Sequence, residues 1–211
     1  MVRSNRLDTM VELTQGYSTV LDIGSDHGLL LLKAFQKGYI QKGIASDLRE
    51  KPLNQAKKNL KDYPVDYVRS DGFLAIKEPY DLVVIAGMGA HLITDILKHA
   101  PHFSVPMILQ PNDKPEKLRD FLSQNGFKII DEFVAFEKHY YPILLIEKGD
   151  ESLDEVSILL GPKLKDKPEA KAYYEHKINT LTPILNRADE NRKSEIRRLI
   201  MLYEEGLARF K

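Results

Sequence analysis

The sequence predicts an α/β protein in which a mostly parallel sheet is followed by a C-terminal pair of helices. Up to about residue 125, five short apolar runs alternate with helical runs, which is the pattern of strands joined by crossover helices. Two further strand-like runs, at 129–136 and 140–147, have only a short turn between them. Beyond residue 150, apolar residues recur at alternating spacings of 4 and 3, which is typical of coiled coils.

Each element follows from its local pattern. A first helix is expected over residues 5–15, with Ser4 or Asn5 as its N-cap. The five parallel strands are expected at 20–23, 43–47, 65–69, 82–86 and 107–110. The helices that connect and follow them are expected at 29–37, 52–62, 90–99 and 115–125, and a short helix fits 152–160.

The last two strand-like runs are too close together for a crossover helix, so 129–136 and 140–147 should form an antiparallel hairpin. A parallel sheet that closes with such a hairpin is the arrangement of the class I, S-adenosylmethionine-dependent methyltransferase fold, which is Rossmann-like. A dinucleotide-dependent dehydrogenase would continue with another crossover. The hairpin therefore favours the methyltransferase arrangement.

We expect two domains, with the sheet in residues 1–150 and a helical domain in residues 151–211. A polar link at 186–191 should let the two long helices of the second domain fold back as an antiparallel coiled-coil hairpin. Pro183 should break or kink the first of these helices near its end. The apolar positions of the two helices are Tyr174, Ile178, Leu181 and Leu185, then Ile196, Ile200, Tyr203, Leu207 and Phe210.

The composition excludes several kinds of chemistry. The chain has 211 residues, of which 43% are hydrophobic and none is cysteine. Without cysteine there is no disulfide, no thiolate metal site and no covalent cysteine adduct, which disfavours methylation of carbon 5 of a pyrimidine. Charged residues interrupt the N-terminal segment, and no apolar run is long enough for a membrane span, so we expect a cytoplasmic protein.

Charge is balanced overall but not along the chain. The formal net charge is zero, yet residues 161–211 hold 12 Lys and Arg against 8 Asp and Glu. This excess fits either a polyanionic partner or an ordinary solvated helix surface. No cluster has metal-ligand spacing, so we expect no metal, and we interpret His99, His102, His139 and His176 as non-functional.

The segment Asp22–Gly28 closes the first strand and opens the next helix, which is where open α/β sheets bind nucleotides. Gly24 fits the tight turn and Gly28 fits close packing of helix on strand. Asp26 stands where a nucleotide-binding loop has its middle glycine, and its carboxylate would repel a pyrophosphate but suits the sulfonium of S-adenosylmethionine. Ser25 and the helix N-terminus can hold the ligand's carboxylate through backbone N–H groups, unless the segment is only a turn capped by Ser25 or Asp26.

Acids follow the second and third strands. Asp47 is placed to accept hydrogen bonds from ribose hydroxyls, and Leu48 comes directly after it. Asp71 is placed to accept from the exocyclic amine of an adenine, and Gly72 leaves room for the ring. A helix cap for Asp47 and a plain turn at 71–72 are the simpler alternatives.

Three further motifs lie at strand ends. The run Ala86-Gly-Met-Gly89 brings backbone close to a ligand, and it replaces the Asn/Asp-Pro-Pro-aromatic motif of enzymes that methylate exocyclic amines. The run Gln110-Pro-Asn112 can present amides to a base edge or can simply cap the next helix. Either Tyr140 or Tyr141 can stack on a flipped base, although strand tyrosines also serve in packing.

Taken together, these motifs resemble the bacterial tRNA (adenine-22-N1)-methyltransferase family. The resemblance covers essentially the whole chain, including Ser4–Leu7, Asp22–His27, Ile85–Gly89, Leu109–Asn112 and the C-terminal helical hairpin. The chain departs from the family where it has Leu29-Leu-Leu in place of an aromatic and a proline, and Ser46-Asp47 in place of Gly-Glu. It also has Ala90 in place of a second glycine, and Tyr141-Pro142 in place of Tyr-Glu.

The resemblance implies S-adenosylmethionine as cofactor and N1 of adenine 22 in tRNA as the methyl acceptor. Asp26 is our candidate catalytic carboxylate. The expected cofactor-binding residues are Asp22, Gly24, Ser25, Asp26, His27, Gly28, Asp47, Leu48, Asp71, Gly72, Ala86, Gly87 and Met88. The expected substrate-binding residues are Arg6, Gly89, Gln110, Pro111, Asn112, Tyr141, Arg192, Lys193, Arg197 and Arg198.

Two other functions remain open at this point. One is a methyltransferase of the same fold that acts on a small molecule or on another RNA. The other is a nucleotide-binding module without catalysis, although such a module is better served by glycine than by Asp26. We expect a monomer rather than an oligomer.

Overall fold

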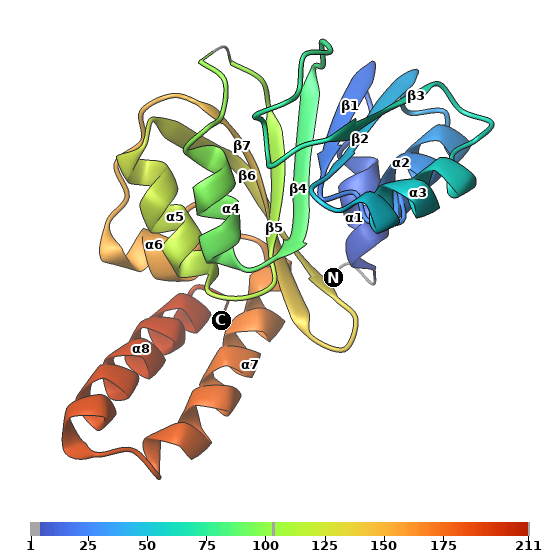
Figure 1. The fold of residues 1–211 in the computed structure, drawn as a ribbon. Helices are drawn as coiled ribbons and strands as arrows, with labels where there is room; N and C mark the ends of the chain where they lie inside the picture. The colour runs from blue at the N-terminus through green and yellow to red at the C-terminus, as the bar shows by residue number, and fades with distance from the viewer. Residues whose placement is uncertain (1–4, 103, 211) are drawn as a thin grey trace.

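The computed structural model describes residues 5–102 and 104–210, and these build one mixed sheet with helices on both faces and a protruding helical pair (Figure 1). Seven strands lie in the order β3-β2-β1-β4-β5-β7-β6. Strands β1 to β5 are mutually parallel, and β7 runs antiparallel to both β5 and β6. The predicted class I methyltransferase arrangement, parallel with a terminal antiparallel hairpin, is confirmed.

The strands are β1 (Thr19–Ile23), β2 (Lys42–Asp47), β3 (Val65–Arg69), β4 (Leu82–Met88), β5 (Met107–Pro111), β6 (Phe127–Phe136) and β7 (Tyr140–Lys148). The helices are α1 (Arg6–Glu12), α2 (Leu29–Gln36), α3 (Glu50–Asn59), α4 (Ala90–Leu97), α5 (Pro115–Gln124), α6 (Glu155–Leu160), α7 (Pro168–Leu185) and α8 (Glu190–Ala208). Among the described residues, no helix is both long enough and apolar enough to cross a membrane.

Helix α1 shows how local chemistry sets the boundaries. Asn5 caps it, because its side chain accepts a hydrogen bond from the Asp8 amide at 3.2 Å. Ser4, the alternative cap, lies outside the described residues. The helix ends at Glu12, short of the predicted residue 15, where the Thr14 hydroxyl donates to the Val11 carbonyl at 2.7 Å and competes with the helical pattern.

The sheet places the carboxyl ends of its five parallel strands on one edge. Strand order reverses between β1 and β4, which are paired neighbours with opposite onward connections. A crevice outside the strand ends at such a reversal is where ligands bind in open α/β sheets. The pairing of β4 with β5 has a register shift between Ala86 and Met88, at the end of β4 that borders this crevice.

The C-terminal helices pack on the sheet through a separate apolar cluster. Tyr173 and Tyr174 of α7 and Tyr203 of α8 are buried there with Val134 of β6. We call this cluster the root of the helical pair. Beyond the root, α7 and α8 lie side by side and extend past the sheet edge (Figure 1). The hairpin is therefore present, while its coiled-coil packing stays a prediction. Pro183 lies inside α7, which ends two residues later at Leu185.

A buried ion pair joins this root to the sheet domain. Arg119 of α5 donates from Nε to Glu132 of β6 at 2.7 Å, and both side chains are almost completely buried. Arg119 also donates to the carbonyls of Ile158 and Leu159 at 3.0 and 3.2 Å. The backbone can approach the pair because residue 161 is glycine: a Cβ there would lie 2.7 Å from Glu132 Oε2.

Glu132 binds the segment that follows α6, because its carboxylate accepts hydrogen bonds from the amides of Lys163 and Leu164 at 3.0 and 3.2 Å. The ion pair thus forms the junction between the sheet and the C-terminal helices. Removing one partner of a buried, hydrogen-bonded pair leaves an uncompensated charge in the interior. The sequence pattern alone did not identify this pair.

We expect Arg119→Met to lower the free energy of unfolding by about 3–5 kcal/mol, because it leaves the Glu132 carboxylate buried and unpaired. Urea unfolding followed by circular dichroism measures the change. Lys42→Ala, which breaks an exposed pair with Asp66, is the control and should cost less than about 1 kcal/mol. Equal small losses in both variants would contradict a structural role for the buried pair.

Candidate active site

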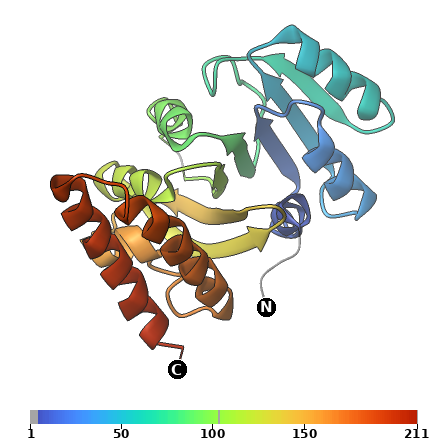
Figure 2. The same cartoon turned by 90° about the horizontal axis from the view of Figure 1, so that it is seen from below.

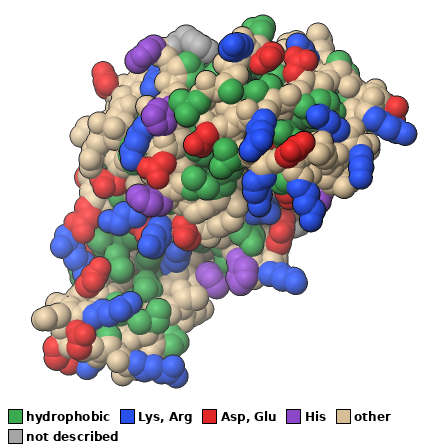
Figure 3. Space-filling view, in the orientation of Figure 1, with side chains coloured by type: hydrophobic (Ala, Val, Ile, Leu, Met, Phe, Trp, Pro, Cys, Tyr) green, Lys and Arg blue, Asp and Glu red, His purple; other side chains and the backbone are tan. Residues whose placement is uncertain are grey.

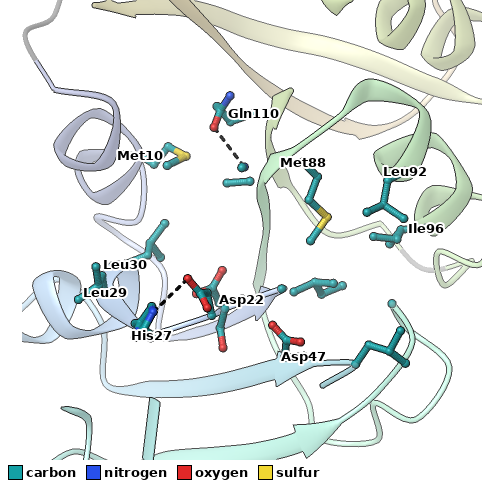
Figure 4. Close-up of a pocket in the computed structure, with 18 of the residues that line it drawn as sticks. Met10, Asp22, His27, Leu29, Leu30, Asp47, Met88, Leu92, Ile96 and Gln110 are labelled. Carbon is teal, nitrogen blue, oxygen red and sulfur yellow. Dashed lines mark hydrogen bonds and ion pairs between the residues drawn. The ribbon is translucent and has the colours of Figure 1, made fainter. Parts of the chain in front are cut away.

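A cavity of about 590 Å³ lies at the strand-order reversal (Figure 4). It gathers residues from the ends of β1, β2, β4 and β5, from the turn after β3, and from α1, α2 and α4. The predicted residues that line it are Arg6, Asp22, Gly24, Ser25, Asp26, His27, Asp47, Leu48, Asp71, Gly72, Ala86, Gly87, Met88, Gln110 and Asn112. The predicted residues outside its lining are Gly28, Gly89, Pro111, Tyr141, Arg192, Lys193, Arg197 and Arg198.

The turn after β1 is shaped by a close contact with Met88. Gly24 has φ of +75°, a left-handed conformation that favours glycine, and a Cβ there would lie 2.1 Å from the Met88 methyl carbon, so the flexible Met88 side chain would have to move. The amides of Gly24 and Ser25 both donate to the Ser46 carbonyl, at 2.8 and 2.9 Å. The prediction that the Ser25 amide holds a ligand carboxylate is therefore wrong, because that amide is used to join β1 to β2. The Ser25 hydroxyl, by contrast, is buried and has no hydrogen-bond partner among the residues that the structure describes.

Gly28 permits a different packing contact from the predicted packing of helix on strand. A Cβ there would lie 2.6 Å from Leu60 Cδ1 and 3.3 Å from the Ala56 Cβ, so Gly28 allows α2 to pack on the end of α3, not on a strand. Gly28 is also the N-cap of α2 and provides no side-chain cap. The first amides of α2 therefore face the cavity side without a capping side chain, which suits an anionic group.

Asp26 lies at the outer part of this turn. Its φ is +49°, a left-handed conformation that aspartate tolerates better than most non-glycine residues. Its carboxylate is more than half exposed and lies 3.5 Å from His27 Nε2 (Figure 4). The side chain that replaces the expected glycine thus faces the cavity, where its charge is available to a ligand.

Two buried carboxylates occupy the floor of the cavity. Asp22 and Asp47 are each 5% exposed, at the ends of neighbouring strands. Asp47 accepts a hydrogen bond from the Arg49 amide at 2.9 Å. Burial, and then repulsion from Asp47, raise the pKa of Asp22 from 3.8 to about 7. The floor therefore concentrates negative charge that a cationic or hydrogen-bond-donating ligand would stabilise.

The turn after β3 forms another wall. Asp71 is exposed and lines the cavity beside Gly72. A Cβ on Gly72 would lie 3.1 Å from Ile96 Cγ2, so the glycine lets this turn lie against α4. The Ser70 hydroxyl fixes the turn, because it donates to the Gly72 carbonyl at 2.8 Å and accepts from the Ala75 amide at 3.0 Å.

A polar network fixes the end of β4. The Gly87 amide donates to Gln110 Oε1 at 3.1 Å, and the Gly87 carbonyl accepts from Asn112 Nδ2 at 2.7 Å. Arg6 Nη1 donates to Gln110 Oε1 and to Asn112 Oδ1, at 3.0 and 3.2 Å. Arginine can only donate, so it fixes which end of each amide faces it. Gln110 is saturated by these contacts and by donation to the Pro111 carbonyl at 2.7 Å, which leaves it no free group for a base edge.

Tyr141 is not free to stack on a base from both sides. The Arg6 guanidinium lies over its ring, 4.7 Å from the centroid. Gly89 is the N-cap of α4 and lies beside Asp113, which accepts from the Ala90 amide at 3.0 Å. These residues support the cavity from outside its lining.

Sequence reasoning missed much of the apolar lining. The cavity is also lined by Leu7, Met10, Ile23, Leu29, Leu30, Arg49, Ser70, Leu92 and Ile96. Leu29 and Leu92 are about half exposed although large and apolar, an unusual state that marks the rim. Only the three-dimensional arrangement identifies them, because the same residues fit an ordinary amphipathic helix.

The predicted basic residues of α8 lie on the protruding helical pair, away from the cavity (Figure 1). Arg192 and Arg197 are exposed. Lys193 pairs with Glu190 at 2.7 Å, and Arg198 pairs with Glu155. These four residues therefore lie apart from the cavity. Only a large ligand can contact these residues and the cavity at the same time.

The comparisons with known proteins agree with this geometry. Residues 20–205 match the model of the tRNA (adenine(22)-N(1))-methyltransferase family, TrmK. The chain belongs to this family. A tRNA (adenine(22)-N(1))-methyltransferase of Bacillus subtilis is 31% identical over 182 residues, covering 79% of this chain and 76% of that protein. The family predicted from the sequence motifs is thus confirmed.

Solved structures of TrmK proteins superpose on the whole chain. M. capricolum TrmK, in complex with the natural cofactor product S-adenosyl-homocysteine, has a TM-score of 0.85 at 27% identity, with 100% of both chains covered. The B. subtilis m1A22 tRNA methyltransferase TrmK has a TM-score of 0.79 at 26% identity, covering 97% of this chain and 98% of that one. The likeness therefore includes the C-terminal helices as well as the sheet.

The raised pKa of Asp22 predicts a pH-dependent stability. Between about pH 4 and pH 7 the folded state holds a proton on Asp22 that the unfolded chain has lost, so Asp22 makes stability fall as pH rises through this range. Asp22→Asn cannot ionise. We expect the stability difference, variant minus wild type, to increase by about 2–3 kcal/mol between pH 5 and pH 8 in ligand-free protein. Urea unfolding at both pH values measures it, and a pH-independent difference would contradict the assignment.

Proposed function

We propose that this chain transfers the methyl group of S-adenosylmethionine to N1 of adenine 22 in tRNA, using the cavity at the β1–β4 reversal. The observation that carries the proposal is the acidic turn residue Asp26, which faces a cavity built at the nucleotide-binding position of a chain that belongs to the TrmK family. Incubation of the protein with tRNA and methyl-labelled cofactor, followed by nucleoside analysis, tests it. A tRNA with guanine at position 22 should remain unlabelled.

The residues present fit the cofactor. The buried Asp47 carboxylate suits ribose hydroxyls, and Asp71 with the neighbouring Gly72 suits an adenine and its amine. The unpartnered Ser25 hydroxyl and the uncapped N-terminus of α2 are free for a carboxylate. When bound, S-adenosylmethionine supplies an electrophilic methyl on a sulfonium, and the acidic floor is complementary to that positive charge.

The protein's part in the reaction is mainly positioning. Adenine N1 is a neutral in-plane lone pair, so no residue has to remove a proton before it attacks. Holding the nucleophile in line with the methyl group can supply several kcal/mol of the barrier reduction. Positive charge then appears on the adenine, and we assign its stabilisation to the Asp26 carboxylate, which can also accept from the adenine amine.

Gln110 and Asn112 act, in this proposal, as positioning residues rather than as readers of the base. Their amides fix both ends of the Gly87 peptide, and Arg6 fixes the amides in turn. The backbone at the end of β4 is thereby held in one conformation beside the cavity. This assignment replaces the predicted contact of Gln110 with a base edge.

The helical region 151–211 is proposed to grip the tRNA, while residues 1–150 hold the cofactor. Extracting a base from a tRNA costs a few kcal/mol, which phosphate and shape contacts elsewhere must offset. Arg192 and Arg197 are exposed and suited to phosphate contacts. We propose that the chain acts as a monomer. The cytoplasm, where tRNA is modified, is the proposed compartment.

We expect Asp26→Asn to reduce turnover of tRNA about 100-fold by removing the charge that faces the reacting base, with cofactor affinity largely retained. Asparagine also tolerates the left-handed backbone, so the turn should keep its shape. Single-turnover methylation and isothermal titration with cofactor measure the two quantities. Turnover within threefold of wild type would remove Asp26 from the mechanism.

The double substitution of Arg192 and Arg197 by alanine should weaken tRNA binding and reduce the slope of log affinity against log salt by about one per lost phosphate contact. Arg198→Ala is the matched control on the same helix, because its charge is already paired with Glu155, and it should have a smaller effect. Fluorescence anisotropy at several salt concentrations measures both. Identical slopes in all three proteins would contradict the proposed contact.

A further inference from the structure

The hairpin between β6 and β7 carries aromatic rings on both faces of its tip. Tyr141 faces the cavity side, where the Arg6 guanidinium covers its ring. The neighbouring Tyr140 faces the other side, as strand alternation requires. It is paired across the strands with Phe136, at a ring-centroid distance of 4.7 Å. The tip thus has one face turned to the cavity and one turned to the protruding helices.

The second face continues onto α7. The ring of Tyr140 lies 4.9 Å from that of His176. Burial, and then Lys177 and His139, lower the pKa of His176, so its ring is neutral at physiological pH. Phe136, Tyr140 and His176 therefore form an aromatic row from the hairpin tip to the root of the helical pair. We predicted from its isolated position in the sequence that His176 is non-functional, whereas in the structure it is part of this aromatic row.

The outer end of this row is exposed. Phe136 is 43% accessible, and the turn residues after it are exposed as well. Exposing the phenylalanine ring to water is unfavourable, and at a hairpin tip the ring adds nothing to the hydrophobic core. Exposed apolar surface of this kind is common at interaction sites. Its inner end is fixed, because Tyr140 also lies 6.0 Å from the buried Tyr173 ring.

The segments around the row carry two cations, Lys138 and Lys177, and two acids, Glu137 and Glu175. Lys138 lies in the turn beside Phe136, and Lys177 follows His176 on α7, with its ammonium over the Tyr173 ring at 5.4 Å. In Figure 3, His side chains gather beside a basic side chain at this lower edge of the molecule, over the β6–β7 turn. Glu137, the acid of the turn, is engaged by the Arg6 amide at 3.0 Å. Flat rings flanked by cations are complementary to a nucleobase and its phosphate.

The aromatic row lies between the cavity and the helical pair, which are the two regions assigned to the reaction. Viewed from below, the hairpin tip lies between α1, which carries Arg6, and α7 (Figure 2). The tip contacts Arg6, which lines the cavity, and His176 of α7, so a ligand that spans the cavity and the helical pair has this surface between its two contacts. This step rests on the proposed function, in which tRNA is that ligand.

We propose that Phe136, with Tyr140 and His176 behind it, is a stacking platform for an unpaired nucleobase of the tRNA other than the methylated adenine. Stacking on aromatic side chains is tolerant of sequence. The platform would therefore add affinity and fix the approach of the tRNA without reading position 22.

The test compares tRNA affinity of wild type and Phe136→Ala by fluorescence anisotropy, using full-length protein and a tRNA transcript. We expect a loss of about 5- to 100-fold for the alanine variant, because stacking on one ring carries that much affinity. Phe136→Trp should restore binding. Ile130→Ala is the matched control: Ile130 is 39% exposed on the same strand but far from the tip, and its loss should leave affinity within twofold.

Two measurements separate this proposal from the function on which it rests. The loss should be the same for a tRNA with guanine at position 22, because the platform does not bind the target base. Cofactor affinity of Phe136→Ala should match wild type, which also shows that the variant is folded. If wild type methylates no tRNA, the proposed function fails, whereas unchanged tRNA affinity in Phe136→Ala overturns only the platform. A drop in molar mass of the variant by light scattering would reassign the row to self-association.

Discussion

The reversal of strand order between β1 and β4 is the constraint on which the rest of the molecule depends. Because β1 and β4 pair directly while their onward connections diverge, no crossover covers the crevice at their carboxyl ends. Apart from Arg6, which comes from α1, every polar group assigned to the cavity is brought there by a strand end or by the turn that follows one. The same edge also receives the start of β7, which runs antiparallel to β5, and so brings the hairpin tip beside the cavity.

Electrostatics then distinguish this crevice from one built for a pyrophosphate. Two carboxylates are buried on its floor, and burial, with repulsion from Asp47 added to it, raises the pKa of Asp22 enough to keep it partly protonated near neutral pH. A third, Asp26, adds exposed negative charge and a left-handed backbone conformation where glycine would cost less. The buried carboxylates and the charge of Asp26 are thus concentrated in one cavity. A ligand with a positive centre and several hydrogen-bond donors stabilises all of these charges together.

Residue patterns predicted the sheet and most of the cavity because parallel strands place their ends on one edge, so an acid or glycine after a strand identifies a site residue directly. Patterns failed where a contact depends on long-range pairing. The Ser25 amide was misassigned because its partner, the Ser46 carbonyl, lies on a neighbouring strand. Arg119 and Glu132 were missed because a buried ion pair has no local signature. Gln110 was assigned to a base because its saturation by Arg6 and Gly87 appears only in three dimensions.

In the proposed function, the junction of the helical pair with the sheet is what lets a separate region contribute to chemistry at the cavity. A flexible tether would raise the local concentration of tRNA without orienting it. Here the Arg119–Glu132 pair, its bonds to the α6 carbonyls, and the buried tyrosines of α7 and α8 fix the root of the helices in the interior. The aromatic row connects that root to the hairpin tip, and Arg6 connects the tip to the end of β4. Contacts made by a large ligand on the helices are therefore held at a set distance from the Gly87 backbone, so binding energy far from the reacting atoms can serve to align them.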